Sequence, residues 1–268
     1  MGYKMLVLDL DDSLLSDDLT ISQANKEAIW CAADSGVQFT IATGRMVKAT
    51  LPYIEQLKIN VPVITYNGAL VLNSVSRETI LHRPISSDIT KEIIDDTEKI
   101  GAYLQLYIDD EYYFKEYNKY SKYYRNLVGF DGFAVGSIDK FAAVKPTKLI
   151  IIDEPKNILK LKDRYCRMFE GKLQVTVSKP MFLEFTHIDA TKGNAIKYLS
   201  NMHNIERNDI IAVGDSYNDI SMIKYAGLGV AMGNAPQIVK DAADFVTLSN
   251  EHNGVAYVIE KFILKGDN

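Results

Sequence analysis

Short apolar runs alternate with segments of helical periodicity in the first third of the chain. Runs at 6–8, 37–42 and 61–65 have the length and composition of strands buried on both faces. The segments between them carry apolar residues three and four positions apart, which predicts a helix capped by Ser22 and a second helix over about 47–57. Strands that alternate with helices of this length predict a right-handed, mainly parallel α/β sheet.

The alternation stops near Arg83-Pro84 and resumes about a hundred residues later. The intervening stretch, 85–184, predicts a helix, two tyrosine-rich strands, a polar-aromatic helix, and then a strand, a helix and a pair of strands. We therefore expect two domains. An α/β domain is formed by 1–84 and 185–268, and an α+β domain at 85–184 is inserted into it.

The composition is that of a globular protein with a substantial core: 268 residues, 47% hydrophobic and 24% charged. A net charge of −5 argues against a nucleic-acid partner or an anionic membrane surface. No run approaches the roughly 18 apolar residues of a membrane span, and the amino terminus enters a strand directly, so we expect no membrane anchor, no signal peptide and a cytoplasmic protein. Cys31 and Cys166 lack the spacing of a metal site or disulfide framework, and the helical pattern predicts that Cys31 lies in the core.

Three aspartates, Asp9, Asp11 and Asp12, follow the first apolar run directly. Side chains two apart in a strand point the same way, so Asp9 and Asp11 are expected to project together where the strand ends. Two like charges this close repel each other unless a cation lies between them or one is protonated. Because open α/β sheets bind ligands at the carboxyl ends of their strands, the cluster indicates a candidate site. The alternative is an acidic turn or helix cap, which Asp and Ser also favour.

Three other segments place comparable chemistry at the ends of predicted elements. A later apolar strand runs into a second acidic turn that contains Asp215 and Asp219. Thr43-Gly44-Arg45 follows the second predicted strand and offers a hydroxyl, a flexible backbone and a guanidinium, all suited to phosphate oxygens. Lys192 lies near the start of a predicted helix, where a cation is unfavourable unless an anion is near. Each segment alone is also typical of a turn, a cap or a surface, but together they indicate one functional site.

Because these residues follow one another along the chain in the order of a known set of motifs, the sequence resembles the haloacid dehalogenase-like phosphatase superfamily, and within it the Cof-type subfamily. The match covers essentially the whole chain, and 249–255 also resembles the end of Cof-type proteins. The matching motifs are Asp9-Leu10-Asp11-Asp12-Ser13-Leu14, where the family usually has Asp-x-Asp-Gly-Thr-Leu, then Thr43, then Lys192, and finally Gly214-Asp215 with Asn218-Asp219.

Two positions of the first motif depart from the family pattern. Ser13 keeps the hydroxyl of the usual Thr, so we expect little effect. Asp12 replaces the usual Gly, which adds a carboxylate near the site and restricts the backbone. Asp tolerates a left-handed backbone better than most residues, so we expect the motif to survive, with substrate preference or rate open to change.

The resemblance implies a Rossmann-like core with an inserted cap, and a Mg²⁺-dependent phosphatase that forms an aspartyl-phosphate. Asp9 would be the nucleophile, and Asp11 would protonate the leaving group and then activate water. The implied Mg²⁺ ligands are Asp9, the backbone carbonyl of Asp11, and Asp215. Asp219 would orient the waters of the metal or Lys192. The implied phosphate-binding residues are Leu10, Thr43, Gly44, Arg45, Lys192 and Asn218, of which Thr43 and Lys192 are also implied to be catalytic.

The expected partner is a small-molecule phosphate ester, bound by a monomer or homodimer without nucleic acid or membrane. Three alternatives stay open: a phosphomutase or sugar-specific phosphatase of the same superfamily, a non-catalytic phospho-ligand sensor, and an RNA-binding protein that uses the Tyr- and Lys-rich stretch 112–125. The intact set of catalytic carboxylates and Lys192 argues against the sensor. The acidic overall charge argues against RNA binding.

The inserted domain contains none of the four motifs, so we expect it to close over the site as a cap and to select the substrate. Eight of the chain's 16 tyrosines lie between residues 103 and 124 of this domain. In one interpretation, one or two of them contact a sugar ring or flat heterocycle. In the other, they pack a small sheet and a helix. The residues are Tyr103, Tyr107, Tyr112, Tyr113, Tyr117, Tyr120, Tyr123 and Tyr124.

Overall fold

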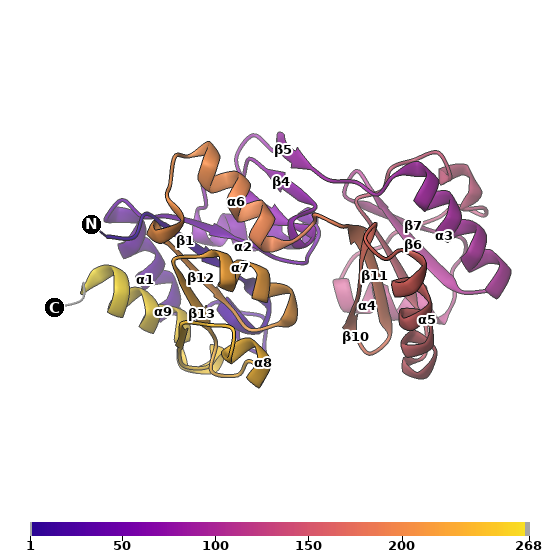
Figure 1. Ribbon diagram of the computed structural model, residues 1–268. Helices are drawn as coiled ribbons and strands as arrows, with labels where there is room; N and C mark the ends of the chain where they lie inside the picture. The colour runs from indigo at the N-terminus through magenta and orange to yellow at the C-terminus, as the bar shows by residue number, and fades with distance from the viewer. Residues whose placement is uncertain (1, 266–268) are drawn as a thin grey trace. The chain divides into compact units, whose positions relative to one another are not determined.

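The computed structural model describes residues 2–265, which form two compact units (Figure 1). The first unit consists of the chain up to Met46, Thr50–Leu81, and the chain from Thr191 onward. The second consists of Val47–Ala49 and His82–Ala190. The second unit extends beyond the expected 85–184, because its last strand, β11 (Phe182–His187), continues past residue 184.

The first unit is built on a five-stranded parallel sheet in the order β14-β13-β12-β1-β2 (Figure 1). The strands are β1 (Met5–Leu8), β2 (Gln38–Ile41), β12 (Ile210–Gly214), β13 (Leu228–Ala231) and β14 (Phe245–Val246). Leu8 on β1 lies opposite Ile41 on β2 and Val213 on β12. The segments after these three strands therefore leave the sheet at one edge, and all three carry candidate residues. The prediction of a mainly parallel α/β fold is confirmed.

The first unit also contains the helices α1 (Gln23–Asp34), α6 (Lys192–Met202), α7 (Ile220–Tyr225), α8 (Gln237–Lys240) and α9 (Gly254–Ile259), while the residues of α2 (Val47–Leu57) are divided between the two units. Ser22 caps α1, because its hydroxyl accepts a hydrogen bond from the Asn25 N–H at 3.1 Å. Helices α6 and α7 pack against the sheet face that carries Val7 and Ala212.

Cys31 is exposed, so the prediction that it lies in the core is wrong. The buried residues of α1 are Asn25, Ala28, Ile29 and Ala32. Their spacing of three and four defines one helix face, and Cys31 falls beside that face rather than on it.

Strand β3 (Val63–Thr65) belongs to a different sheet from the predicted one. It pairs antiparallel with β4 (Leu70–Leu72) in a three-stranded sheet of order β3-β4-β5, where β5 is Thr79–His82. An isolated parallel bridge between Ala42 and Ile64 keeps β3 beside the end of β2. The turn Tyr66–Gly68 reverses the chain after β3, and an apolar run alone does not indicate such a reversal.

The second unit is α+β, with a six-stranded, mainly antiparallel sheet in the order β10-β11-β9-β6-β7-β8. The remaining elements are α3 (Ser87–Ile100), β6 (Tyr103–Ile108), β7 (Glu111–Phe114), α4 (Lys119–Val128), β8 (Phe133–Ala134), β9 (Lys148–Ile152), α5 (Pro155–Met168) and β10 (Leu173–Lys179). Its core joins Ile93 of α3 and Tyr165 of α5 to Leu106, Ile151 and Leu183 of the strands. Within residues 2–265, no helix combines the length and apolarity needed to cross a membrane.

The tyrosines of the second unit divide by exposure. Tyr103, Tyr107, Tyr112 and Tyr124 are buried. The rings of Tyr107, Tyr112 and Tyr124 contact one another, and the Tyr103 ring contacts Phe114 and Tyr120. Tyr117 is 66% exposed and Tyr123 is 42% exposed. Packing therefore accounts for the buried rings, while Tyr117 and Tyr123 offer ring surface to solvent.

Candidate active site

Asp9 stands where β1 ends, and the sheet itself places it. Its N–H donates to the Val213 carbonyl at 3.0 Å, which extends the pairing of β1 with β12 by one residue. The chain then turns sharply through Leu10–Leu14, and Asp12 takes a left-handed backbone with φ of 57°. The Asp12 side chain is exposed, and its carbonyl accepts a hydrogen bond from Asn234 Nδ2 at 2.7 Å. The turn thus accepts Asp where the family usually has Gly.

Lys192 is fully buried and joins two carboxylates from different segments. It is the first residue of α6, and Thr191 caps that helix by accepting a hydrogen bond from the Asn194 N–H. Its Nζ donates to Asp9 Oδ1 and to Asp219 Oδ1, both at 2.5 Å. Burial alone would lower the pKa of Lys192, but the charges of Asp219 and Asp9 raise it above its usual value. The two aspartates therefore favour the protonated, cationic form of Lys192.

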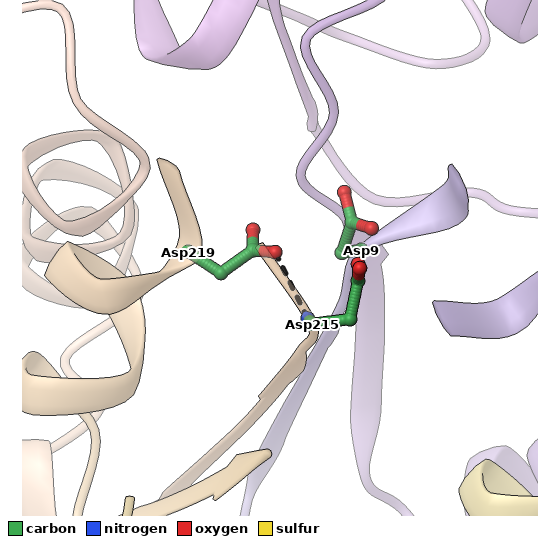
Figure 2. Close-up of side chains that lie close together, drawn as sticks. All are labelled: Asp9, Asp215 and Asp219. Atoms are coloured by element: carbon green, nitrogen blue, oxygen red, sulfur yellow. Dashed lines mark hydrogen bonds between the residues drawn. The ribbon is translucent and has the colours of Figure 1, made fainter. Parts of the chain in front are cut away.

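Asp215 and Asp219 follow β12 and are held by different partners (Figure 2). Asp219 Oδ2 accepts hydrogen bonds from the N–H groups of Asp215 at 3.0 Å and Ser216 at 2.9 Å. With Lys192 on its other oxygen, Asp219 has three donors. Asp215 accepts one hydroxyl on each oxygen, from Ser13 at 3.0 Å and from Ser216 at 3.1 Å.

Negative charge exceeds positive charge in this cluster. Carboxylate oxygens of Asp9, Asp215 and Asp219 lie within 4.8 Å of one another, and Lys192 forms ion pairs with Asp9 and Asp219. Burial and then the charge of Asp219 raise the pKa of Asp9 well above its usual value. The same two causes raise the pKa of Asp215 to about 6. Within residues 2–265, three ionised carboxylates against the one ammonium of Lys192 would leave a deficit of two positive charges, which suits a divalent cation with oxygen ligands.

Asp11 lies apart from this buried cluster and is bound by Arg45. Arg45 Nε donates to Asp11 Oδ2 at 2.9 Å, and Nη2 donates to Oδ1 at 2.5 Å, a bidentate pair. The Asp11 side chain is 47% exposed, whereas that of Asp9 is 7% exposed. The guanidinium of Arg45 also lies over the Tyr53 ring at 5.1 Å. Asp9 and Asp11 therefore have different partners in this structure: Asp9 pairs with Lys192, and Asp11 pairs with Arg45.

Thr43, Gly44 and Arg45 form the turn after β2. Thr43 is buried, and its hydroxyl accepts a hydrogen bond from the Arg45 N–H at 3.1 Å. Asn218 is exposed and donates through Nδ2 to Asn67 Oδ1 at 2.9 Å. The Leu10 side chain is fully buried, so that residue presents backbone rather than side chain to any ligand.

Asn67 lies beside these candidate residues, although it is not among those that the sequence motifs indicate. It lies in the turn Tyr66–Gly68 after β3, beside Gly44, and contacts Asn218. The available signal was its position, since Asn-Gly directly after a buried strand marks a tight turn at the same sheet edge as the other candidates.

Comparison with known proteins gives consistent matches along the whole chain. A family model described as haloacid dehalogenase-like hydrolase matches residues 6–259. The 5-amino-6-(5-phospho-D-ribitylamino)uracil phosphatase YwtE of Bacillus subtilis is 31% identical over 97% of this chain and 98% of its own length. Phosphatase YwpJ of the same organism is 30% identical over 97% of this chain and 100% of its own. The crystal structure of TM0651 from Thermotoga maritima matches with a TM-score of 0.88 at 34% identity, covering 96% of this chain and 97% of the other.

Proposed function

Because this chain belongs to the family of haloacid dehalogenase-like hydrolases and is a phosphatase, we propose that it hydrolyses small phosphorylated metabolites with Mg²⁺ and through an aspartyl-phosphate on Asp9. The observation that carries the proposal is the buried cluster in which Lys192 bridges Asp9 and Asp219 beside Asp215. A purely structural role would leave this cluster short of positive charge, since burying unpaired carboxylates is costly.

The residues fit a magnesium ion in number and chemistry. Asp9 and Asp215 would hold it together with the backbone carbonyl of Asp11, all oxygen ligands of the kind Mg²⁺ prefers. Asp219 already has three hydrogen-bond donors, which supports a role in holding Lys192 and the Asp215 backbone instead. When bound, the ion would supply the positive charge that lets an anionic phosphate approach an anionic nucleophile.

Asp9 supplies the nucleophile in this proposal. Lys192 fixes one oxygen of its carboxylate, and among residues 2–265 the other oxygen has no hydrogen-bond partner. An Asp9 oxygen forms a bond to phosphorus as the bond from phosphorus to the leaving oxygen breaks. Lys192 stays protonated and offsets negative charge on the transferring group.

Asp11 supplies the proton transfers. It protonates the leaving oxygen in the first step, and in the second it takes a proton from the water that attacks phosphorus and releases Asp9. Because Arg45 occupies both carboxylate oxygens in this structure, Asp11 must leave that pair to act. Arg45 is then free to bind an anionic oxygen of the substrate. Thr43, the Gly44 backbone and Asn218 complete the proposed phosphate site.

The second unit is proposed to select the substrate. Among the eight tyrosines between residues 103 and 124, Tyr117 and Tyr123 are the most exposed. Exposed aromatic rings can bind sugars and flat heterocycles. The relative YwtE is named for a substrate that joins a phosphorylated ribityl chain to a uracil ring. We propose phosphate esters of sugars or sugar alcohols as the substrate class, with or without a heterocycle.

A phosphate-release screen tests the proposal. The panel contains sugar phosphates, a ribityl phosphate and p-nitrophenyl phosphate, each assayed with Mg²⁺ and with a chelator. We expect release of inorganic phosphate that requires Mg²⁺. Conversion of a sugar phosphate to an isomer without phosphate release would instead identify a phosphomutase, and binding without turnover would identify a sensor.

A further inference from the structure

The turn Tyr66–Gly68 has an unusual backbone for its sequence. All three residues have positive φ: 51° at Tyr66, 57° at Asn67 and 96° at Gly68. Gly adopts this region freely and Asn tolerates it, but a tyrosine rarely does. Such a conformation persists where the surroundings over-determine it, and those places cluster at functional sites.

Neighbouring segments of the candidate site hold this turn in place. The Tyr66 N–H donates to the Arg45 carbonyl at 3.0 Å, and the Asn67 N–H donates to the Thr43 carbonyl at 2.9 Å. At Gly68, a Cβ atom would lie 2.4 Å from the Thr191 carbonyl oxygen, so the turn packs directly against the residue that caps the helix of Lys192. The turn therefore links the phosphate turn after β2 to the start of α6.

The Asn67 side chain lies over Gly44. A Cβ atom on Gly44 would be 2.9 Å from Asn67 Oδ1 and 3.3 Å from Nδ2, so the amide uses the space that a side chain at 44 would fill. Asn67 Oδ1 accepts the hydrogen bond from Asn218 Nδ2. This bond orients the amide, so the Asn67 NH₂ group is the part of the amide that remains to donate to a ligand. In the described part of the chain, neither the Asn67 NH₂ nor the Gly44 N–H has an acceptor.

We propose that Asn67 is a further phosphoryl-binding residue, whose NH₂ donates to a phosphate oxygen beside the Gly44 N–H while Asn218 holds its carbonyl oxygen. The inference rests on the proposed function, since it assigns a donor to the same phosphate site. Two adjacent unpaired donors at the edge where Lys192 and Asp9 meet have the polarity that an anion requires. The competing explanation is that Asn67 is present only because its backbone is left-handed.

Two substitutions separate these explanations. Asn67→Gly keeps the backbone conformation, which Gly adopts without strain, and removes the donor. Asn67→Asp keeps the shape and the acceptor for Asn218, but replaces the donor by a negatively charged oxygen. Asn204 is a matched control, because it is exposed, has φ of 54° and lies after the far end of α6. Asn204→Gly and Asn204→Asp therefore report the backbone and charge effects alone.

The measurement is calorimetric titration of each variant with inorganic phosphate in the presence of Mg²⁺, together with melting temperatures. We expect Asn67→Gly to bind phosphate about tenfold to a hundredfold more weakly than the wild type, because it loses one hydrogen bond to a charged group. Asn67→Asp should lose more affinity, because it places a negative charge beside the phosphate. Both should melt close to the wild-type temperature, and both Asn204 variants should bind phosphate as the wild type does.

Phosphate binding by Asn67→Gly and Asn67→Asp within twofold of the wild type would overturn the role of Asn67 and leave the proposed function standing. A wild-type protein that neither binds phosphate nor releases it from any ester would overturn the proposed function, and the assignment of Asn67 with it. If Asn67→Gly folds poorly, Asn67→Asp still decides, since it preserves both the backbone preference and the bond to Asn218.

Discussion

Lys192→Met removes the cation that pairs with the buried Asp9 and Asp219 while nearly preserving side-chain length. Lys192 is 0% exposed, and the side chains of its partners Asp9 and Asp219 are 7% and 0% exposed. Breaking a buried pair by removing one partner costs about 3 to 5 kcal/mol, because the remaining charge is left uncompensated. In a chelator, the first unit should lose that much unfolding free energy, which lowers its melting temperature by about 6 to 20 °C.

Trp30 makes the assay selective, because it is the only tryptophan of the chain and lies on α1 of the first unit. Its fluorescence during urea unfolding reports the unit that contains Lys192. Lys197→Met is the matched control: an exposed lysine on the same helix, whose loss should change stability by less than about 0.5 kcal/mol. Mg²⁺ should restore part of the lost stability of Lys192→Met. Equal stability of the two variants in chelator would refute the electrostatic account of the cluster.

Three further predictions concern pH, Arg45 and the second unit. In chelator, the unfolding free energy should fall as pH rises from about 4 to about 6, because the folded pKa of Asp215, about 6, lies above its ordinary value and the folded state keeps the proton longer. Stabilisation by Mg²⁺, measured as a melting-temperature shift, should therefore be larger at pH 7 than at pH 5, and equal shifts would contradict this. Arg45→Lys loses the bidentate contact, so kcat/KM should fall about tenfold, while loss of this partly exposed ion pair changes stability by about 1 kcal/mol. Tyr117→Ala should reorder substrates by kcat/KM, whereas Tyr198→Ala, an exposed tyrosine of the first unit, should not; an unchanged order would place specificity elsewhere.

The fold class and the family were predictable because their signals are local. A buried strand needs only a short apolar run, and the aspartates that follow β1 and β12 are adjacent to those runs in sequence. The position of Lys192 at a helix start, where a cation is unfavourable alone, correctly indicated nearby anions. The Mg²⁺ requirement and the roles of the site residues stay predictions.

Contacts between distant segments were not predictable in the same way. The bond between Arg45 and Asp11 joins residues 34 positions apart and depends on how one turn directs a side chain. Asn67 was overlooked because Asn before Gly is common in turns that have no ligand. Strand β3 was assigned to the wrong sheet since an apolar run specifies burial but not the partner strand. In each case the missing information is the direction of the chain after an element ends.

The central claim is that Asp9 carries the phosphoryl group, and one trapping experiment tests it directly. Asp11→Asn is mixed with p-nitrophenyl phosphate and Mg²⁺, quenched in acid, digested, and the phosphorylated peptide is located by mass spectrometry. Because p-nitrophenolate needs no proton to leave, the first step should proceed and the second should stall without its base. We predict a burst of about one p-nitrophenolate per chain and phosphate on the peptide that contains Asp9. No burst and no phosphorylated Asp9, together with wild-type phosphate release by Asp9→Asn, would contradict the account.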